Sequence, residues 1–173
     1  GGSVIAFHKF DAEAVLAAIE RYKVTHAFFV PTMFQRLLDL PEAVRRRHDV
    51  SSICHAIHGA DPCPAHVKRA MIAWWGPVID ELYGGTESIG QTFISSQEWL
   101  RHPGSVGKPS GHVEAKIVDE SGNRLPPGAS GLVMMRNPQR FESHGAAAAD
   151  AGRAYDEEGF ASLGDIGYLD EEG

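Results

Sequence analysis

Apolar residues recur at helical spacing in the first hundred residues of this chain, and short apolar runs separate the helical stretches. In the first stretch Val15, Leu16 and Ile19 share one helix face, and Asp11 can cap its start. The pattern predicts helices over residues 11–23, 42–48 and 64–75, a further helix after Pro31 that contains residues 33–38, and strands over residues 26–30, 53–57 and 77–83.

Strands that alternate with amphipathic helices favour crossover connections and a mainly parallel sheet. The predicted strands end at Val30-Pro31, at Ile57-His58-Gly59 and at Leu82-Tyr83-Gly84. The carboxyl ends of parallel strands lie along one edge, where open α/β sheets bind ligands. We therefore expect any ligand site of this region at these strand ends.

The pattern changes after about residue 100, where Gly and Pro become frequent and the helical period disappears. Residues 113–118 alternate in polarity, residues 120–123 form a turn, and residues 131–136 read as another strand. These features predict an α/β domain over residues 1–100 and a small antiparallel, barrel-like subdomain over residues 101–173.

The composition narrows the class of protein. Hydrophobic residues make up 43% of the 173 residues and charged residues 23%, which excludes a collagen, a coiled coil or a mostly disordered chain. Sixteen basic against 23 acidic residues give a net charge of −7, which argues against nucleic acid or an anionic membrane as partner. No apolar run reaches the roughly 18 residues of a membrane span.

Cysteine use and the two ends of the chain indicate the context. Cys54 and Cys63 are the only cysteines, too few for a disulfide scaffold, so we expect a reducing, cytoplasmic location. The chain opens on Gly-Gly-Ser without an initiator Met and stops directly after a strand-like run. We therefore expect a segment of a longer protein, whose open sheet edge could pair with a second copy as an artefact of the cut.

The most informative motif is Tyr83-Gly84-Gly85-Thr86-Glu87. Glycines let backbone N–H groups turn toward a phosphate, and the Thr86 hydroxyl can donate to a phosphate oxygen. Glu87 offers a hard oxygen ligand for Mg²⁺, and Tyr83 offers a flat face to a base. The same run also fits a simple strand-ending turn with its polar side chains in solvent.

A second motif is Gly164-Asp165-Ile166-Gly167-Tyr168. An aspartate between glycines at the start of a strand can accept hydrogen bonds from both hydroxyls of a ribose. The alternative is an ordinary aspartate turn before a strand.

Thiol and imidazole side chains also gather within 13 residues, but no paired C-x-x-C knuckle is present. A buried Cys54 with histidines in loops is the favoured alternative to a zinc site. The residues concerned are Cys54, His55, His58, Cys63 and His66.

Residues 83–87 resemble the Y-G-x-T-E signature of the adenylate-forming synthetases, which include AMP-forming acyl-CoA ligases, luciferases and peptide-synthetase adenylation domains. Four further segments resemble motifs of this family in the family's order, and the chain is most similar to fatty or aryl acyl-CoA ligases. These segments are 30–33 (V-P-T-M), 58–62 (H-G-A-D-P), 104–109 (G-S-V-G-K-P) and 164–168 (G-D-I-G-Y).

The resemblance implies an α/β fold that corresponds to the second half of the family's large domain. It implies activation of a carboxylic acid with ATP to an acyl-adenylate and pyrophosphate, followed by transfer to the CoA thiol with release of AMP. The implied roles are stacking on adenine for Tyr83, the opposite wall for Gly59 and Ala60, α-phosphate binding for Thr86, Mg²⁺ binding for Glu87, ribose binding for Asp165, nucleotide contact for Gly84, and proximity to the acid substrate for His58, Leu82, Gly84, Val106 and Gly107.

The chain departs from the family pattern in several respects. The family's phosphate loop lies upstream of this stretch and its small carboxy-terminal domain, with a catalytic lysine, lies downstream, so we expect the isolated chain to be inactive. Leu163 stands where Thr is common, and Leu82 stands where Gly is common and narrows the expected acyl tunnel. The alternatives are an adenylation domain that loads a carrier protein, a non-catalytic α/β interaction module and a zinc-binding structural domain.

Overall fold

The computed structural model describes residues 1–85, 89–138 and 155–173, which form two compact units. Unit 1 comprises Gly1–Glu81 and Ser95–Ser105, and unit 2 comprises Leu82–Ile94 and Val106–Gly173. The expected division into domains of residues 1–100 and 101–173 stays a prediction. Within the described ranges, no helix is both long and apolar enough to cross a membrane.

The helices of unit 1 begin and end where local chemistry favours it. The Asp11 side chain accepts a hydrogen bond from the Ala14 N–H at 2.9 Å, and Lys23 ends the same helix in the left-handed conformation. Pro31 occupies the first turn of the second helix, where a missing N–H costs nothing. The elements are α1 (Ala12–Tyr22), β1 (His26–Phe29), α2 (Pro31–Leu38), α3 (Glu42–Arg45), β2 (His55–His58), α4 (Ala65–Trp75), β3 (Ile79–Gly84) and α5 (Ser96–Arg101).

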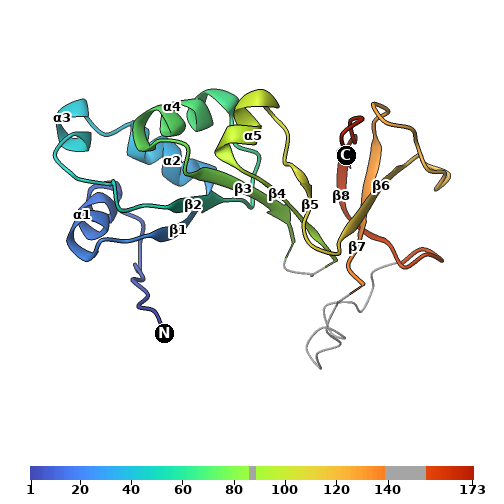
Figure 1. The fold of residues 1–173 in the computed structure, drawn as a ribbon, viewed down its shortest axis with the longest axis horizontal. Helices are drawn as coiled ribbons and strands as arrows, with labels where there is room; N and C mark the ends of the chain where they lie inside the picture. The colour runs from blue at the N-terminus through green and yellow to red at the C-terminus, as the bar shows by residue number, and fades with distance from the viewer. Residues whose placement is uncertain (86–88, 139–154) are drawn as a thin grey trace. The chain divides into compact units, whose positions relative to one another are not determined.

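Strands β1, β2 and β3 pair in parallel, with Phe29 opposite His58 and His58 opposite Glu81. Helices α2 and α4 lie side by side over one face of these strands (Figure 1). The sheet continues in the order β1-β2-β3-β4-β5, and β4 pairs with β5 in antiparallel register. The fold is therefore mixed α/β, and its first sheet combines both pairing modes.

The core of unit 1 is aromatic on the face that α2 and α4 cover. Phe29 of β1 packs against Phe34 of α2 and Trp75 of α4, with ring centroids 5.1 and 5.6 Å apart. Phe34 also meets the His58 ring edge-on at 5.5 Å. These contacts bury the apolar stripe of each helix, which is the main source of helix stability in a domain of this kind.

An ion pair is buried in the same core. The Lys68 ammonium of α4 lies 2.6 Å from Oε2 of Glu81 on β3, and both side chains are less than a tenth exposed. The ammonium also lies 4.9 Å from the centroid of the Trp99 ring. Burial lowers the pKa of Lys68, and the Glu81 carboxylate opposes this shift. Because both charges are shielded from water, solvent cannot take the place of either partner. The pair therefore holds α4 and β3 together.

His58 lies beside this ion pair and is fully buried. Its Nε2 is 3.5 Å from Glu81 Oε2, and neither ring nitrogen has a hydrogen-bond partner among the described residues. Burial first, and then the Lys68 charge, lower the pKa of His58 to about 3. The imidazole is therefore neutral at neutral and mildly acidic pH.

Unit 2 contains the end of β3 and a second sheet. In the order β6-β7-β8, this sheet is antiparallel throughout, and its described strands form an open sheet without barrel closure. Ile89, Met135 and Ala161 form its buried centre, with Tyr83 packed against them. The strands of unit 2 are β4 (Gln91–Ile94), β5 (Lys108–Pro109), β6 (Glu114–Val118), β7 (Gly131–Arg136) and β8 (Ala161–Gly167).

Several sequence-based expectations need correction. Strand β2 starts at His55, two residues later than predicted, and Cys54 before it is exposed rather than buried. Asp165 lies inside β8 and not in a turn that precedes a strand. Strands β4 and β5 and helix α5 were not predicted, although Ser95 and Glu98 form a capping box at the start of α5.

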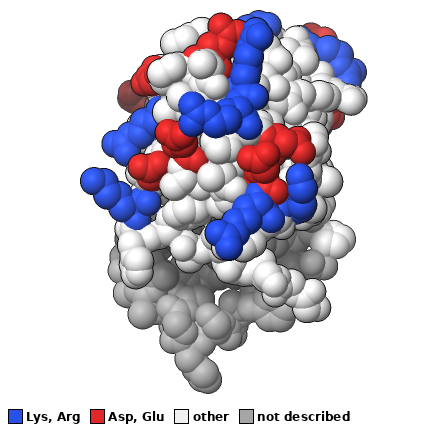
Figure 2. All heavy atoms as spheres, turned by 90° about the vertical axis from the view of Figure 1, so that its left-hand side faces the viewer, with Lys and Arg blue, Asp and Glu red and all other residues white. Residues whose placement is uncertain are grey.

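Basic and acidic side chains alternate on the face of unit 1 shown in Figure 2. Arg47 pairs with Glu13 and Lys23 with Asp49, both at exposed positions. The Arg45 guanidinium lies 5.3 Å from the centroid of the Trp74 ring. The basic run at residues 45–47 is thus part of a balanced, solvated surface and not of a cationic patch.

We expect Lys68→Met to destabilise the protein by about 3–5 kcal/mol, because it leaves the Glu81 carboxylate buried without a counter-charge. The double variant Lys68→Met/Glu81→Leu should recover most of this loss, since it removes both charges. Urea unfolding followed by tryptophan fluorescence measures both effects. Lys23→Met is the control and should cost less than about 1 kcal/mol, because its ion pair is exposed. A double variant as unstable as the single variant would contradict the role of the ion pair.

We expect His58 to make the fold sensitive to acid. The folded protein keeps this imidazole neutral down to about pH 3, whereas in the unfolded chain it takes up a proton below its ordinary pKa of 6.5. Stability is therefore complete above pH 6.5 and falls as the pH drops toward 3, by at most about 1.4 kcal/mol per pH unit. Unfolding free energies of wild type and His58→Leu at pH 4 to 7 test this. Equal slopes for the two proteins would show that His58 does not contribute.

Candidate functional site

Two of the predicted site residues meet directly in unit 2. The Tyr83 hydroxyl, at the end of β3, donates a hydrogen bond to Oδ2 of Asp165 on β8 at 2.8 Å. The two residues are 82 positions apart in the chain. The fold thus joins the Y-G-G-T-E motif to the G-D-I-G-Y motif, which sequence spacing alone did not require.

Tyr83 and Asp165 differ in environment. The Tyr83 ring is half-buried and packs against the cluster of Ile89, Met135 and Ala161. Burial first, and then the hydrogen bond to Asp165, raise the pKa of Tyr83 well above its usual range. Asp165 is exposed to solvent. The site therefore pairs an anchored phenol, which keeps its proton, with an accessible carboxylate.

The end of β3 is tightly packed around Gly84. A Cβ at this position would lie 3.0 Å from both the Gln91 Cβ and the Gly90 carbonyl oxygen. Leu82 and Gly84 are both half-buried. A side chain at position 84 would press on β4, so the backbone here requires glycine or a shift of its neighbours.

The Val106–Gly107 turn is held by β4. The Thr92 hydroxyl donates a hydrogen bond to the Val106 carbonyl at 2.6 Å. Gly107 has a φ of 83°, and a Cβ on it would lie 2.0 Å from the Phe93 carbonyl oxygen. This turn is therefore fixed by its backbone, and Thr92 is a residue that the sequence reasoning did not identify.

Three predicted site residues lie in unit 1. The His58 side chain is in the core under α2 and α4, and the Gly59 N–H donates to the Phe29 carbonyl at 3.4 Å. Ala60 is exposed and has a φ of 74°, an uncommon value for a residue with a Cβ. The expected proximity of these residues to adenine or to the acid stays a prediction.

Thr86 and Glu87, the predicted phosphate and Mg²⁺ residues, lie outside the described residues. Within the described ranges, no group of three or more His, Cys, Asp or Glu side chains is placed to hold a metal ion. The five described side chains of the zinc alternative therefore do not form such a group.

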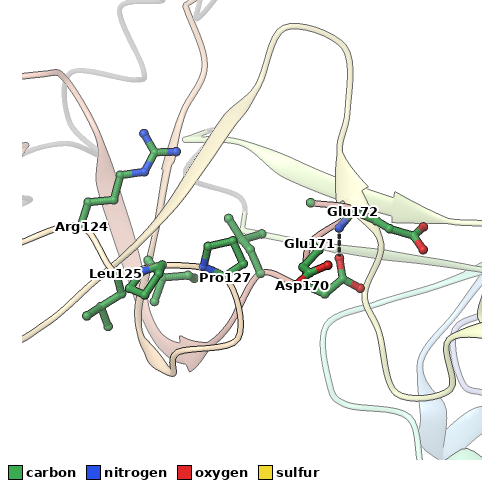
Figure 3. A pocket seen from close by; sticks show the side chains of 10 residues that line it. Arg124, Leu125, Pro127, Asp170, Glu171 and Glu172 are labelled. Atoms are coloured by element: carbon green, nitrogen blue, oxygen red, sulfur yellow. Dashed lines mark hydrogen bonds between the residues drawn. The ribbon is translucent and has the colours of Figure 1, made fainter.

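A cavity of about 350 Å³ lies elsewhere in unit 2 (Figure 3). Its wall combines Leu125, Pro127 and Leu169 with the polar segment Asp170–Gly173. Asp170 accepts a hydrogen bond from the Glu172 N–H at 2.9 Å across this segment. None of the predicted site residues lines the cavity. We therefore do not assign the functional site to it.

The sequence reasoning also missed Lys68 and Glu81. Lys68 shares its helix face with Met71, Ile72 and Trp75, at the spacing of a buried stripe. A lysine within such a stripe indicates a buried partner of opposite charge. That signal was present in the sequence.

The fold and the joined motifs are those of adenylate-forming enzymes, and comparison with known proteins identifies the family. The family model described as "AMP-binding enzyme" matches residues 1–143, so the chain belongs to this family. Among curated proteins, the chain is 31% identical over 177 residues to "Probable CoA ligase CCL5" of Humulus lupulus. That match covers 100% of this chain and 32% of the relative, so the chain spans about a third of that protein's length.

Solved structures share the fold. The amide bond synthetase McbA from Marinactinospora thermotolerans matches with a TM-score of 0.80 and 31% identity, over 96% of this chain and 34% of that protein. O-succinylbenzoate coenzyme A synthetase from Bacillus subtilis, solved in complex with AMP, matches with a TM-score of 0.73 and 30% identity, over 95% of this chain and 33% of that protein.

We expect Gly107→Ala to destabilise the protein by at least about 3 kcal/mol, because the added methyl meets a backbone carbonyl that cannot move independently. Gly128→Ala is the matched control: its φ is 82° and nothing lies within 4 Å of its Cβ position, so it should cost only about 1–2 kcal/mol. Melting temperatures of both variants test the difference. Equal losses would show that the turn at Gly107 can relax.

Proposed function

We propose that this chain is part of an AMP-forming acyl-CoA ligase that activates a carboxylic acid with ATP and transfers the acyl group to CoA. The observation that supports this proposal best is the hydrogen bond between Tyr83 and Asp165. It unites the two motifs to which the family resemblance assigns adenine and ribose binding. The CoA ligase and synthetase names of two matched proteins agree with a CoA-dependent activity.

The chemistry of the two residues fits a nucleoside. An ionised carboxylate accepts hydrogen bonds at both oxygens, and only one oxygen of Asp165 is engaged by Tyr83. The accessible carboxylate can therefore accept from the two hydroxyls of a ribose. The half-buried aromatic ring of Tyr83 offers one side for stacking against a purine. The AMP complex of the Bacillus subtilis relative supports a nucleotide as ligand.

The remaining roles follow from the resemblance and from general chemistry. We propose that Thr86 donates its hydroxyl to the α-phosphate and that Glu87 binds Mg²⁺. When bound, Mg²⁺ would neutralise the phosphate charge that grows during attack by the carboxylate. Leu82, Gly84 and the Val106–Gly107 turn would border the acid, together with His58. Gly59 and Ala60 would face the adenine.

The proposal extends to the whole protein. We propose that residues 1–100 and 101–173 belong to separate domains of the whole protein. We also propose that β6, β7 and β8 form part of a barrel-like subdomain. We further propose that the whole protein acts in the cytoplasm. The isolated segment should be inactive, because the phosphate loop and the catalytic lysine of the family lie outside it.

The test uses the full-length protein, ATP–pyrophosphate exchange with a panel of fatty and aryl acids, and direct detection of the CoA thioester. We expect exchange with at least one acid, and we expect Asp165→Ala to lower kcat/KM for ATP about 100-fold, because two hydrogen bonds to a charged acceptor are lost. Asp170→Ala, five residues further along, is the control and should leave the rate unchanged.

Two results would contradict the proposal. No exchange with any acid would exclude adenylate formation, and an unchanged rate in Asp165→Ala would remove its structural basis. Exchange without a CoA thioester would exclude CoA as the acceptor and favour a carrier-protein thiol.

A further inference from the structure

The Tyr83 hydroxyl makes a contact that stacking on a base does not require. Stacking uses the ring face, which phenylalanine provides equally well. In this structure the hydroxyl instead donates to Asp165 Oδ2 at 2.8 Å. The contact therefore needs an explanation of its own.

We propose that the Tyr83 hydroxyl is a positioning group that fixes the Asp165 carboxylate for ribose, and so makes binding selective for ribonucleotides over deoxynucleotides. This inference rests on the proposed function, because it assumes that Asp165 receives the ribose. It assigns to Tyr83 a second role that is separable from any contact of its ring with the base.

The surroundings of Asp165 explain why positioning is needed. Asp165 is exposed, its neighbour Ile166 is 71% exposed, and nothing lies within 4 Å of the Cβ position of Gly164. An aspartate in such open surroundings samples several rotamers, and a ligand that needs one of them must first restrict the others. A hydrogen bond from Tyr83 selects one rotamer in advance.

Tyr83 is suited to hold the carboxylate because it is itself held. Its ring packs against Ile89, Met135 and Ala161, whose side chains are at most 2% exposed. Its raised pKa keeps the phenol protonated, so that it donates to the carboxylate at neutral and mildly alkaline pH. Tyr83 also occupies only Oδ2 of Asp165, which leaves Oδ1 and the second lone pair of Oδ2 for two ribose hydroxyls.

The experiment measures binding of AMP and of 2′,3′-dideoxy-AMP to the full-length protein by isothermal titration calorimetry. We expect Tyr83→Phe to weaken AMP about fivefold to tenfold while leaving dideoxy-AMP unchanged, because only AMP uses the positioned carboxylate. In the Asp165→Ala background, Tyr83→Phe should have no further effect on AMP, since the hydroxyl acts through Asp165. Tyr83→Leu, which also removes the ring, should weaken both ligands.

Tyr22→Phe is the matched control, because it removes the hydroxyl of an exposed tyrosine on α1 in unit 1. It should leave both affinities unchanged. Equal weakening of AMP and dideoxy-AMP by Tyr83→Phe, or no weakening of AMP, would overturn the inference while Asp165→Ala still weakens AMP. Absence of AMP binding by the wild type, or an unchanged affinity in Asp165→Ala, would overturn the proposed nucleotide site and the inference with it.

Discussion

The ion pair between Lys68 and Glu81 is the interaction on which the arrangement of unit 1 depends most. It lies between α4 and β3, where water cannot solvate either charge, so each side chain has to face the other. The Trp99 ring of α5 lies against the same ammonium. The Lys68 ammonium thus fixes how α4 and α5 pack against β3. Nonpolar packing alone would fix this arrangement less selectively. Two residues after Glu81 the same strand carries Tyr83.

The candidate site combines a half-buried side chain, Tyr83, with an exposed one, Asp165. Burial of the Tyr83 ring stabilises unit 2, because the ring covers the small core of Ile89, Met135 and Ala161. Exposure of Asp165 leaves its carboxylate hydrated and accessible, at the cost of a less defined orientation. Through the hydrogen bond between them, a tyrosine that packs against the core restricts the orientation of the exposed carboxylate. It does so without burying the carboxylate, which would cost much more free energy.

The sequence predicted the elements whose signals are local. The Asp11 cap, the helix that contains residues 33–38, the alternating run of β6 and the strand β7 all lie where the pattern placed them, within a few residues. Strands β4 and β5 were missed because they are four and two residues long and rest on pairing with distant partners. Helix α5 was missed although its capping box was readable at Ser95 and Glu98. Cys54 was expected to be buried because it adjoins an apolar run, but β2 begins only after it.

The candidate site was less predictable than the fold. Motif order identified Tyr83 and Asp165, but a contact across 82 positions depends on tertiary structure, and no local pattern encodes it. The structure places the His58 side chain, neutral and fully buried, in the core of unit 1, and its expected proximity to the acid stays a prediction. Residue type and spacing therefore select candidate residues, but they do not encode which other residues each one contacts in the folded chain.

Charge placement constrains how unit 2 could hold a phosphate. Lys116 lies 2.7 Å from Asp156, Arg136 lies 2.8 Å from Glu114, and the Lys108 ammonium donates to the Glu172 carbonyl at 2.7 Å. Carboxylates thus neutralise most of the charge of Lys116 and Arg136, whereas the partner of Lys108 is a neutral carbonyl. Lys116 and Arg136 are therefore less available to a polyanionic ligand than unpaired cations would be. The ribose and base contacts proposed for Asp165 and Tyr83 need no positive charge, so they do not depend on these cations.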